Sequence, residues 1–278
     1  MISDSHMHTK IYSPDASQSP EELITTAKSL GIKNVTITEH NDMDFPDKEF
    51  IWEFDLQEYS RSIKEWQEFS RSIDGPSVHM GIEIGWQSHL KDRIEQTATA
   101  LPFDSLLLSI HVFHGVDIYY GGDIALMPRK ERNKEYISAL ARMCREIDNY
   151  DIVAHYDYIN RYIEDKSSSV FYKDCPEEFD DLFDALISKD KALEINTASI
   201  EKQIVKGSSY IMPDPDVIRR YISMGGKLIT IGSDAHTTER IGLHFDRTAK
   251  YLKSLGVSEI FYYEGRTPIS DPEYSKYF

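Results

Sequence analysis

The segment Asp4-Ser5-His6-Met7-His8, DSHMH, lies near the start of the sequence, where residues 2–8 could form a strand. Side chains alternate between the two faces of a strand, so His6 and His8 would point to the same side and could bind one metal ion together. A motif this short also occurs without a metal, as polar residues at a solvated terminus. Whether DSHMH is a metal site therefore depends on whether other ligands arrive at the same place.

The composition predicts a large, acidic, globular protein. The chain has 278 residues, of which 40% are hydrophobic, and this length suits one α/β barrel. The 31 basic and 47 acidic residues give a formal net charge of −16. This charge argues against a nucleic-acid polymer as partner, but not against a small phosphorylated substrate, because bound metal ions add positive charge.

The chain predicts a cytoplasmic protein. Its two cysteines, Cys144 and Cys175, lie in or just before helical patterns, which favours free thiols in a reducing compartment. The start of the chain has no basic region followed by an apolar run, and no apolar run approaches the length that crosses a membrane. We therefore expect no membrane partner.

Seven short runs rich in β-branched or large apolar residues predict buried strands, at 2–6, 34–38, 78–84, 105–111, 152–155, 192–195 and 227–231. Helical patterns separate most of them. In SPEELITTAKSLG, for example, Ser19 and Glu22 form a capping box around Pro20. Strands that alternate with helices indicate parallel β–α units, and no linker divides the chain. The sequence predicts a single-domain barrel over residues 1–278, with an extra edge strand at 259–263.

Nearly every predicted strand ends in a residue that can bind a metal. In a parallel barrel the carboxyl ends of the strands meet at one rim. One histidine at a strand end is usually structural, but six such strand ends are difficult to explain by packing. We therefore interpret DSHMH as part of a metal site shared with the residues that end the later strands: His40, Glu83, His111, His155, Glu194 with Asn196, and Asp234 with His236.

The ordered series His6-x-His8, Asp15, His40, Glu83, His111, His155, Asp234-x-His236 resembles the PHP family of metal-dependent phosphoesterases, and its histidinol-phosphate phosphatase branch most closely. The resemblance extends from DSHMH to GSDAH, and the ordered set is far more specific than any single element. It implies a distorted (β/α)7 barrel that holds two to three divalent metal ions.

The resemblance also implies how the ligands are divided. The first ion would be held by His6, His8, Glu83 and Asp234. The second would be held by Glu83, His111 and His155, so that Glu83 bridges the two ions. The third would be held by Asp15, His40 and His236, although some family members have a histidine where this chain has Asp15.

The chemistry of these ligands fits hydrolysis of a phosphate ester. Imidazole and carboxylate ligands together suit Zn²⁺, Fe, Mn²⁺ or Co²⁺ better than Mg²⁺ or Ca²⁺. Two ions about 3.5–4 Å apart can lower the pKa of a bridging water and clamp the attacking and leaving oxygens. We expect the catalytic group to be a metal-bound hydroxide held by Glu83, His111, His155 and Asp234. Asp4 either orients a ligand histidine or is a solvated terminal aspartate.

Binding of the phosphate needs positive groups in addition to the metal ions. Arg161 is a candidate because guanidinium binds phosphate in a forked geometry, and its place relative to the family favours this role over a surface arginine. Lys202 follows EINT, where the resemblance implies a basic residue, but Glu201 beside it departs from that pattern. Asn196 is a further substrate-binding candidate. His114 either meets the substrate, protonates the leaving alcohol, or is a loop histidine.

The stretch of about 42–77 is a long insertion after the second predicted strand. It contains an aromatic helical pattern, with Tyr59, Trp66 and Phe69, which is more typical of packed core than of a cofactor site. We hypothesise that the insertion covers the rim as a specificity lid.

The sequence thus predicts a metal-dependent phosphatase that hydrolyses L-histidinol phosphate in histidine biosynthesis. A phosphoesterase of the same family that acts on nucleotides or another small monoester would use the same site. A metal-dependent amide hydrolase would not need Arg161. A non-catalytic metal-binding protein would hydrolyse no phosphate ester. The oligomeric state stays open.

Overall fold

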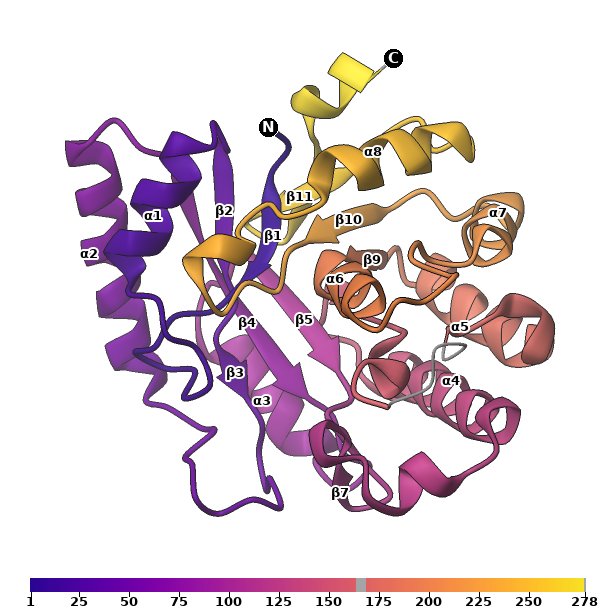
Figure 1. The fold of residues 1–278 in the computed structure, drawn as a ribbon. Coiled ribbons are helices and arrows are strands. Elements are labelled where there is room, and N and C mark those ends of the chain that lie inside the picture. The colour runs from indigo at the N-terminus through magenta and orange to yellow at the C-terminus, as the bar shows by residue number, and fades with distance from the viewer. Residues whose placement is uncertain (164–168, 278) are drawn as a thin grey trace.

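A nearly closed barrel of seven parallel strands forms the centre of the molecule (Figure 1). The computed structural model describes residues 1–163 and 169–277. Around the barrel the strands follow the order β1-β2-β4-β5-β8-β9-β10. Their bounds are Asp4–Met7 (β1), Asn34–Ile37 (β2), Ser77–Gly85 (β4), Ser105–Ser109 (β5), Ile152–Val153 (β8), Ala192–Asn196 (β9) and Ile229–Gly232 (β10).

The first and last barrel strands meet through a few contacts rather than a continuous ladder. Met7 forms a parallel bridge with Ala235. The Asp234 amide donates to the His6 carbonyl at 2.8 Å, and the His8 amide donates to the Ala235 carbonyl at 3.1 Å. This closure confirms the predicted (β/α)7 barrel and brings DSHMH beside GSDAH.

Helices form an outer layer around the strands in the described part of the chain (Figure 1). The Ser19 hydroxyl accepts from the Glu22 amide at 3.2 Å and the Glu22 carboxylate accepts from the Ser19 amide at 2.7 Å, which confirms the predicted capping box. The helices are Pro20–Ser29 (α1), Leu56–Ser72 (α2), Lys91–Ala100 (α3), Arg129–Glu146 (α4), Pro176–Ser188 (α5), Thr197–Val205 (α6), Pro215–Ser223 (α7) and Phe245–Ser254 (α8). Short 3₁₀ turns span Ile118–Tyr120, Gly122–Leu126, Tyr158–Asn160, Tyr172–Asp174, Thr238–Arg240 and Pro272–Tyr277.

The insertion at 42–77 contains two different structures. Helix α2 packs on the outside of the barrel, where the Tyr59 hydroxyl donates to the carbonyls of Ile37 and Gly81 at 2.9 and 2.8 Å. The segment 42–55, which we call the rim loop, lies at the carboxyl ends of the strands. The hypothesis of a lid therefore applies to the rim loop alone, because α2 is the ordinary crossover helix between β2 and β4.

Two small hairpins lie outside the barrel ladder. Val112–Phe113 (β6) pairs with Val116–Asp117 (β7), and Phe261–Glu264 (β11) pairs with Thr267–Ser270 (β12). A strand does form within the predicted run 259–263, but it does not lie at the edge of the barrel sheet as predicted. That run joins β12 in a separate two-stranded sheet instead of extending the barrel.

Candidate active site

The carboxyl ends of the barrel strands place the predicted ligands around one point. A short break at Thr38 and Glu39 separates β2 from His40–Asn41 (β3), which pairs with β4 so that His40 lies opposite Glu83. Asp234 follows β10 with a φ of +53°, and His155 follows β8 with a φ of +21°. Such strained backbone in residues other than glycine is concentrated at functional sites.

Glu83 lies between two groups of histidines. Its Oε2 atom is 3.2 Å from His6 Nε2 and 3.6 Å from His8 Nε2. Its Oε1 atom is 3.2 Å from His111 Nε2 and 2.8 Å from His155 Nε2. A carboxylate with one oxygen in each group is suited to bridge two metal ions.

Asp234 Oδ1 adds a carboxylate oxygen to the first group. It lies 3.7 Å from His6 Nε2 and 3.3 Å from His8 Nε2. His6, His8, Glu83 and Asp234 thus bring four donor atoms together.

A third group of donors lies nearer the mouth of the site. Asp15 Oδ2 is 3.0 Å from His236 Nε2 and 3.7 Å from His40 Nε2, and the two imidazole nitrogens are 3.3 Å apart. His40 also approaches the bridging carboxylate, with 3.0 Å between its Nδ1 atom and Glu83 Oε2. His40 therefore connects the third group of donors to the Glu83 carboxylate that the first two groups share.

The Nδ1 atoms of three of these histidines are held by hydrogen bonds. His6 Nδ1 lies 2.7 Å from Glu194 Oε1, His111 Nδ1 2.9 Å from Asp42 Oδ1, and His236 Nδ1 2.9 Å from the Asp234 carbonyl. Because each of these oxygens is an acceptor, we assign the proton to Nδ1, which leaves the Nε2 lone pair directed at the other donors.

The donor set fits divalent metal ions. His6 Nε2 and His8 Nε2 are only 3.0 Å apart, and Glu83 Oε2 is buried without a hydrogen bond among the described residues. Lone pairs of two imidazoles and a carboxylate that face one another are stabilised by a cation between them. Mixed nitrogen and oxygen ligands are typical of Zn²⁺ and related transition-metal ions.

Burial and neighbouring charges shift the pKa values of the cluster residues in both directions. Burial alone raises the pKa of Glu83, but His6, His111 and His40 hold it well below its ordinary value, so the carboxylate is ionised. Burial lowers the pKa of His8 well below its ordinary value, which keeps that imidazole neutral. Burial also lowers the pKa of His111, but Asp42 and Glu83 more than offset it and raise the pKa to about 10. A metal ion at His111 must displace that proton.

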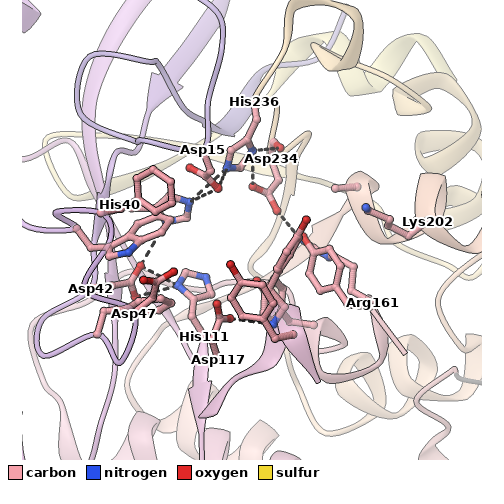
Figure 2. A pocket seen from close by; sticks show the side chains of 18 of the residues that line it. Asp15, His40, Asp42, Asp47, His111, Asp117, Arg161, Lys202, Asp234 and His236 are labelled. Carbon is pink, nitrogen blue, oxygen red and sulfur yellow. Dashed lines mark hydrogen bonds and ion pairs between the residues drawn. The ribbon is translucent and has the colours of Figure 1, made fainter. Parts of the chain in front are cut away.

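A cavity of about 430 Å³ opens from these ligands (Figure 2). Its lining includes five of the predicted ligands, Asp15, His40, His111, Asp234 and His236, and two of the predicted substrate contacts, Arg161 and Lys202. The rim loop contributes Phe45, Asp47, Phe50 and Trp52, and Tyr158 and Tyr162 add further aromatic surface. The cavity is thus both polar and aromatic.

Arg161 is buried between the metal-ligand cluster and α6. Its Nη1 atom donates to Asp234 Oδ2 at 2.5 Å, and its Nη2 atom donates to the Ser199 hydroxyl at 3.2 Å. Its Nε atom is buried without a partner among the described residues. The two oxygens of Asp234 therefore face different groups, Oδ1 the histidines and Oδ2 the guanidinium.

Two of the predicted substrate contacts lie outside the cavity lining. Asn196 Nδ2 donates to Glu194 and Asp234 at 3.1 and 3.3 Å, while its Oδ1 caps α6. His114 lies at the exposed turn of the β6–β7 hairpin and contacts Glu135 at 3.0 Å. The structure thus gives Asn196 an internal role and places His114 on the surface.

Asp4 takes a position that neither sequence interpretation predicted. The side chain is fully buried and accepts from the backbone amides of Ser233 and Gly242 at 2.9 and 3.3 Å. It therefore joins β1 to the segment after β10 rather than binding an imidazole or facing solvent.

Sequence reasoning missed the roles of Asp42 and Glu194. Both hold the Nδ1 atom of a predicted ligand histidine, and the Glu194 carboxylate also accepts from the His155 amide at 2.8 Å. Glu194 shares the strand-end position of Glu83, and this pattern marked it without indicating its partner. Asp42 follows His40 by two residues, but its contact with His111 depends on the barrel.

Comparisons with known proteins identify the family. A family model described as the PHP domain matches residues 4–198. A probable histidinol-phosphatase of Clostridium acetobutylicum is 31% identical over 94% of this chain and 97% of its own length. The histidinol-phosphatase of Lactococcus lactis subsp. lactis is 30% identical over 94% of both chains.

Solved structures agree on the fold. The crystal structure of histidinol phosphate phosphatase from L. lactis, complexed with zinc, L-histidinol and phosphate, has a TM-score of 0.83 and 27% identity, and the match covers 96% of this chain and 98% of that one. A putative histidinol phosphatase from Listeria monocytogenes has a TM-score of 0.73 at 18% identity, over 88% of this chain and 99% of its own. The chain described here, with its barrel and its cluster of imidazole and carboxylate ligands, belongs to the PHP family.

Proposed function

We propose that this protein is a phosphoric monoester hydrolase that converts L-histidinol phosphate to L-histidinol and phosphate, the reaction expected in histidine biosynthesis. The observation that carries the proposal is the meeting of nine imidazole and carboxylate side chains beside a cavity that also contains Arg161 and Lys202. The full-length match to a phosphatase complexed with zinc, L-histidinol and phosphate supports this substrate.

The proposal includes two to three divalent ions, with Zn²⁺, Fe, Mn²⁺ or Co²⁺ as candidates. The first would be held by His6, His8, Glu83 and Asp234, the second by Glu83, His111 and His155, and the third by Asp15, His40 and His236. Ions bound there would supply a nucleophile at neutral pH and neutralise charge on the phosphate.

Residues of the chain prepare the site for this chemistry. Asp42 and Glu194 fix the orientation of His111 and His6, so that their Nε2 atoms face inward. Arg161 presents a buried guanidinium at the cavity wall, where it would bind the phosphate in a forked geometry. Lys202 lies in the same wall and would add a second positive charge.

The proposal also concerns the surroundings of the reaction. In the part of the chain that the structure describes, no helix meets the length and apolar character needed to cross a bilayer. Both cysteines are free and buried, which is in keeping with a reducing compartment. We place the reaction in the cytoplasm, with a small phosphorylated substrate as the partner and no nucleic-acid polymer or membrane.

His111→Ala tests the proposal. We expect the variant to fold, to bind less metal and to lose phosphate release from L-histidinol phosphate almost completely. Phosphate release and metal content should be measured on the same preparations, with mononucleotides and sugar phosphates as competing substrates. Full activity in His111→Ala would overturn the site, and a strong preference for mononucleotides would overturn the substrate.

His114→Ala serves as the matched histidine variant. Because the described structure places His114 at an exposed hairpin turn, we expect this variant to keep its activity within about twofold. A large loss would restore His114 as a substrate contact or as the proton donor to the leaving alcohol.

A further inference from the structure

The charges of the cavity wall are separated into two regions. Arg161, Lys202 and Arg240 form a positive wall. Asp47 of the rim loop and Asp117 at the end of β7 form an acidic wall beside His111, away from Lys202 (Figure 2). A ligand that fits both walls carries negative charge at one end and positive charge at the other.

The two acidic side chains are fixed by their own loops. Asp47 Oδ1 accepts from the Glu49 amide at 2.8 Å, and Asp117 Oδ1 accepts from the Tyr119 amide at 2.8 Å. Within residues 1–163 and 169–277, the second oxygen of each carboxylate has no hydrogen bond from the protein. Each side chain is thus positioned while one oxygen stays available to a ligand.

Neither carboxylate forms an ion pair with the described part of the protein. In the described residues no Lys, Arg or His nitrogen lies within ion-pair distance of Asp47 or Asp117. Burial raises the pKa of Asp117. The Tyr119 amide and His111 lower this pKa, and the nearby carboxylates of Asp42 and Asp47 raise it. Asp42 contacts the His111 imidazole directly, whereas Asp47 and Asp117 have no such contact among the described residues. A cation between them would relieve this repulsion.

The β6–β7 hairpin explains how Asp117 reaches the cavity. The strands pair Val112 with Asp117, and the turn between them exposes His114. The Ile118 amide donates to the His111 carbonyl at 3.0 Å, which returns the chain to the rim beside a metal ligand. The hairpin therefore presents Asp117, and not His114, to the substrate.

We propose that Asp47 and Asp117 form a subsite for the ammonium group of the substrate, opposite the wall that binds its phosphate. This inference rests on the proposed function, since L-histidinol phosphate carries a primary ammonium and a phosphate. The subsite selects phosphorylated amines over phosphate esters that lack a positive charge, because a charged hydrogen bond is available only to the amine.

The test compares Asp47→Asn, Asp117→Asn and the double variant with the wild type on two substrates. For L-histidinol phosphate we expect each single variant to lower kcat/KM by about 10-fold or more, chiefly through KM. For p-nitrophenyl phosphate, which has no ammonium, we expect less than a twofold change. Asp123→Asn is the matched control, because Asp123 is exposed and does not line the cavity.

Binding measurements provide a second readout. L-histidinol should bind more weakly to both single variants, whereas inhibition by inorganic phosphate should stay unchanged. Equal losses on both substrates, or no loss on L-histidinol phosphate, would overturn the subsite. Loss of one metal ion per chain in Asp47→Asn or Asp117→Asn would also overturn it, in favour of a metal site.

Failure of the proposed function would be distinguishable from failure of the subsite. If the wild type hydrolyses p-nitrophenyl phosphate but not L-histidinol phosphate, the proposed substrate is wrong. The subsite is then tested with aminoalkyl phosphates against alkyl phosphates of the same length. A preference for the amines that Asp117→Asn abolishes would support the subsite, and equal rates in the wild type would overturn it.

Discussion

Two glycines make room for the carboxylates that orient two of the predicted metal ligands, His111 and His6. A Cβ atom on Gly85 would overlap the Asp42 carboxylate, and a Cβ atom on Gly232 would overlap the Glu194 carboxylate and the Cβ of His6. Gly85 ends β4 and Gly232 ends β10, so both lie at the rim. Because these positions have no side chain, the Asp42 and Glu194 carboxylates can lie against the backbone at the rim.

Gly85→Ala should therefore impair catalysis through Asp42. The methyl group would displace the Asp42 carboxylate, and His111 would lose the partner of its Nδ1 atom. Losses of partners of this kind typically cost 10- to 100-fold in metal affinity or activity, and we expect about this effect on kcat/KM. Activity should be measured across a titration of Zn²⁺.

A double-mutant cycle identifies the cause of the loss. If the methyl group acts by displacing Asp42, Gly85→Ala should have little further effect in an Asp42→Ala background. Additive losses would show that Gly85→Ala perturbs the strand itself rather than the orientation of His111.

At the scale of elements, the rim loop is held mainly by side chains of α3 and the segment before it. Arg93 Nη1 donates to Asp44 Oδ1 at 2.9 Å, and Arg93 Nη2 donates to Glu53 Oε2 at 2.8 Å. Gln87 Nε2 donates to the Met43 carbonyl at 2.8 Å. Because Asp44 and Glu53 lie near opposite ends of the loop, Arg93 closes its base.

Arg93→Ala should loosen the rim loop without changing the predicted metal ligands. We expect KM for L-histidinol phosphate to rise about 2- to 10-fold with kcat nearly unchanged, because exposed ion pairs each contribute modestly. Steady-state kinetics at low and high ionic strength should show the difference from wild type shrinking as salt screens the pairs.

Two variants control for a general effect of charge. Arg93→Lys keeps the charge but cannot bridge both carboxylates in a forked geometry, so it should be intermediate. Arg219→Ala removes an exposed pair with Asp216 on α7 and should behave as wild type. A fall in kcat without a change in KM would contradict the role of Arg93 in holding the rim loop.

At the scale of the whole molecule, the β11–β12 hairpin closes the end of the barrel opposite the active site. Gly265 and Arg266 form its two-residue turn with φ of +54° and +63°, as a type I′ turn requires. The Gly265 amide donates to Asp104 Oδ1 at 2.9 Å, and Arg266 Nε donates to the buried carboxylate of Asp151. Asp104 and Asp151 immediately precede β5 and β8, so the hairpin ties the last part of the chain to the amino ends of these strands.

Arg266→Ala should destabilise the fold in a way that depends on pH. Burial raises the pKa of Asp151 although Arg266 lowers it, so removing Arg266 should raise this pKa further. A carboxyl group whose pKa is raised in the folded state is tolerated while protonated and costs stability once ionised. We expect a loss of about 1–3 kcal/mol near pH 8, after allowance for the partial exposure of Arg266, and a smaller loss near pH 5.

Urea unfolding of wild type and variant at pH 5, 6.5 and 8 would measure this difference. The pH dependence of metal binding is common to both proteins and cancels in the comparison. Arg266→Lys keeps the positive charge and should recover part of the stability. A loss that is the same at every pH would show that Arg266 acts through packing alone.

Much of the architecture follows from local patterns in the sequence. The apolar runs, the Ser19–Glu22 capping box and the regular alternation of strand and helix predict the parallel barrel, because periodicity and capping act over a few residues. The histidines and carboxylates at the strand ends predict the shared site, because a parallel barrel brings all carboxyl ends to one rim.

Contacts between distant segments follow from the tertiary structure alone. The pairings of His111 with Asp42 and of His6 with Glu194 join residues 69 and 188 positions apart, and no local pattern specifies them. The burial of Asp4, the exposure of His114 and the position of Asp117 likewise depend on barrel closure and on one hairpin. The sequence by itself determined which imidazole and carboxylate side chains stand at the strand ends, because this depends only on their order along each apolar run. Only the folded chain decided which atoms face one another and which charges stay without a partner, because these depend on how the strands close around the site.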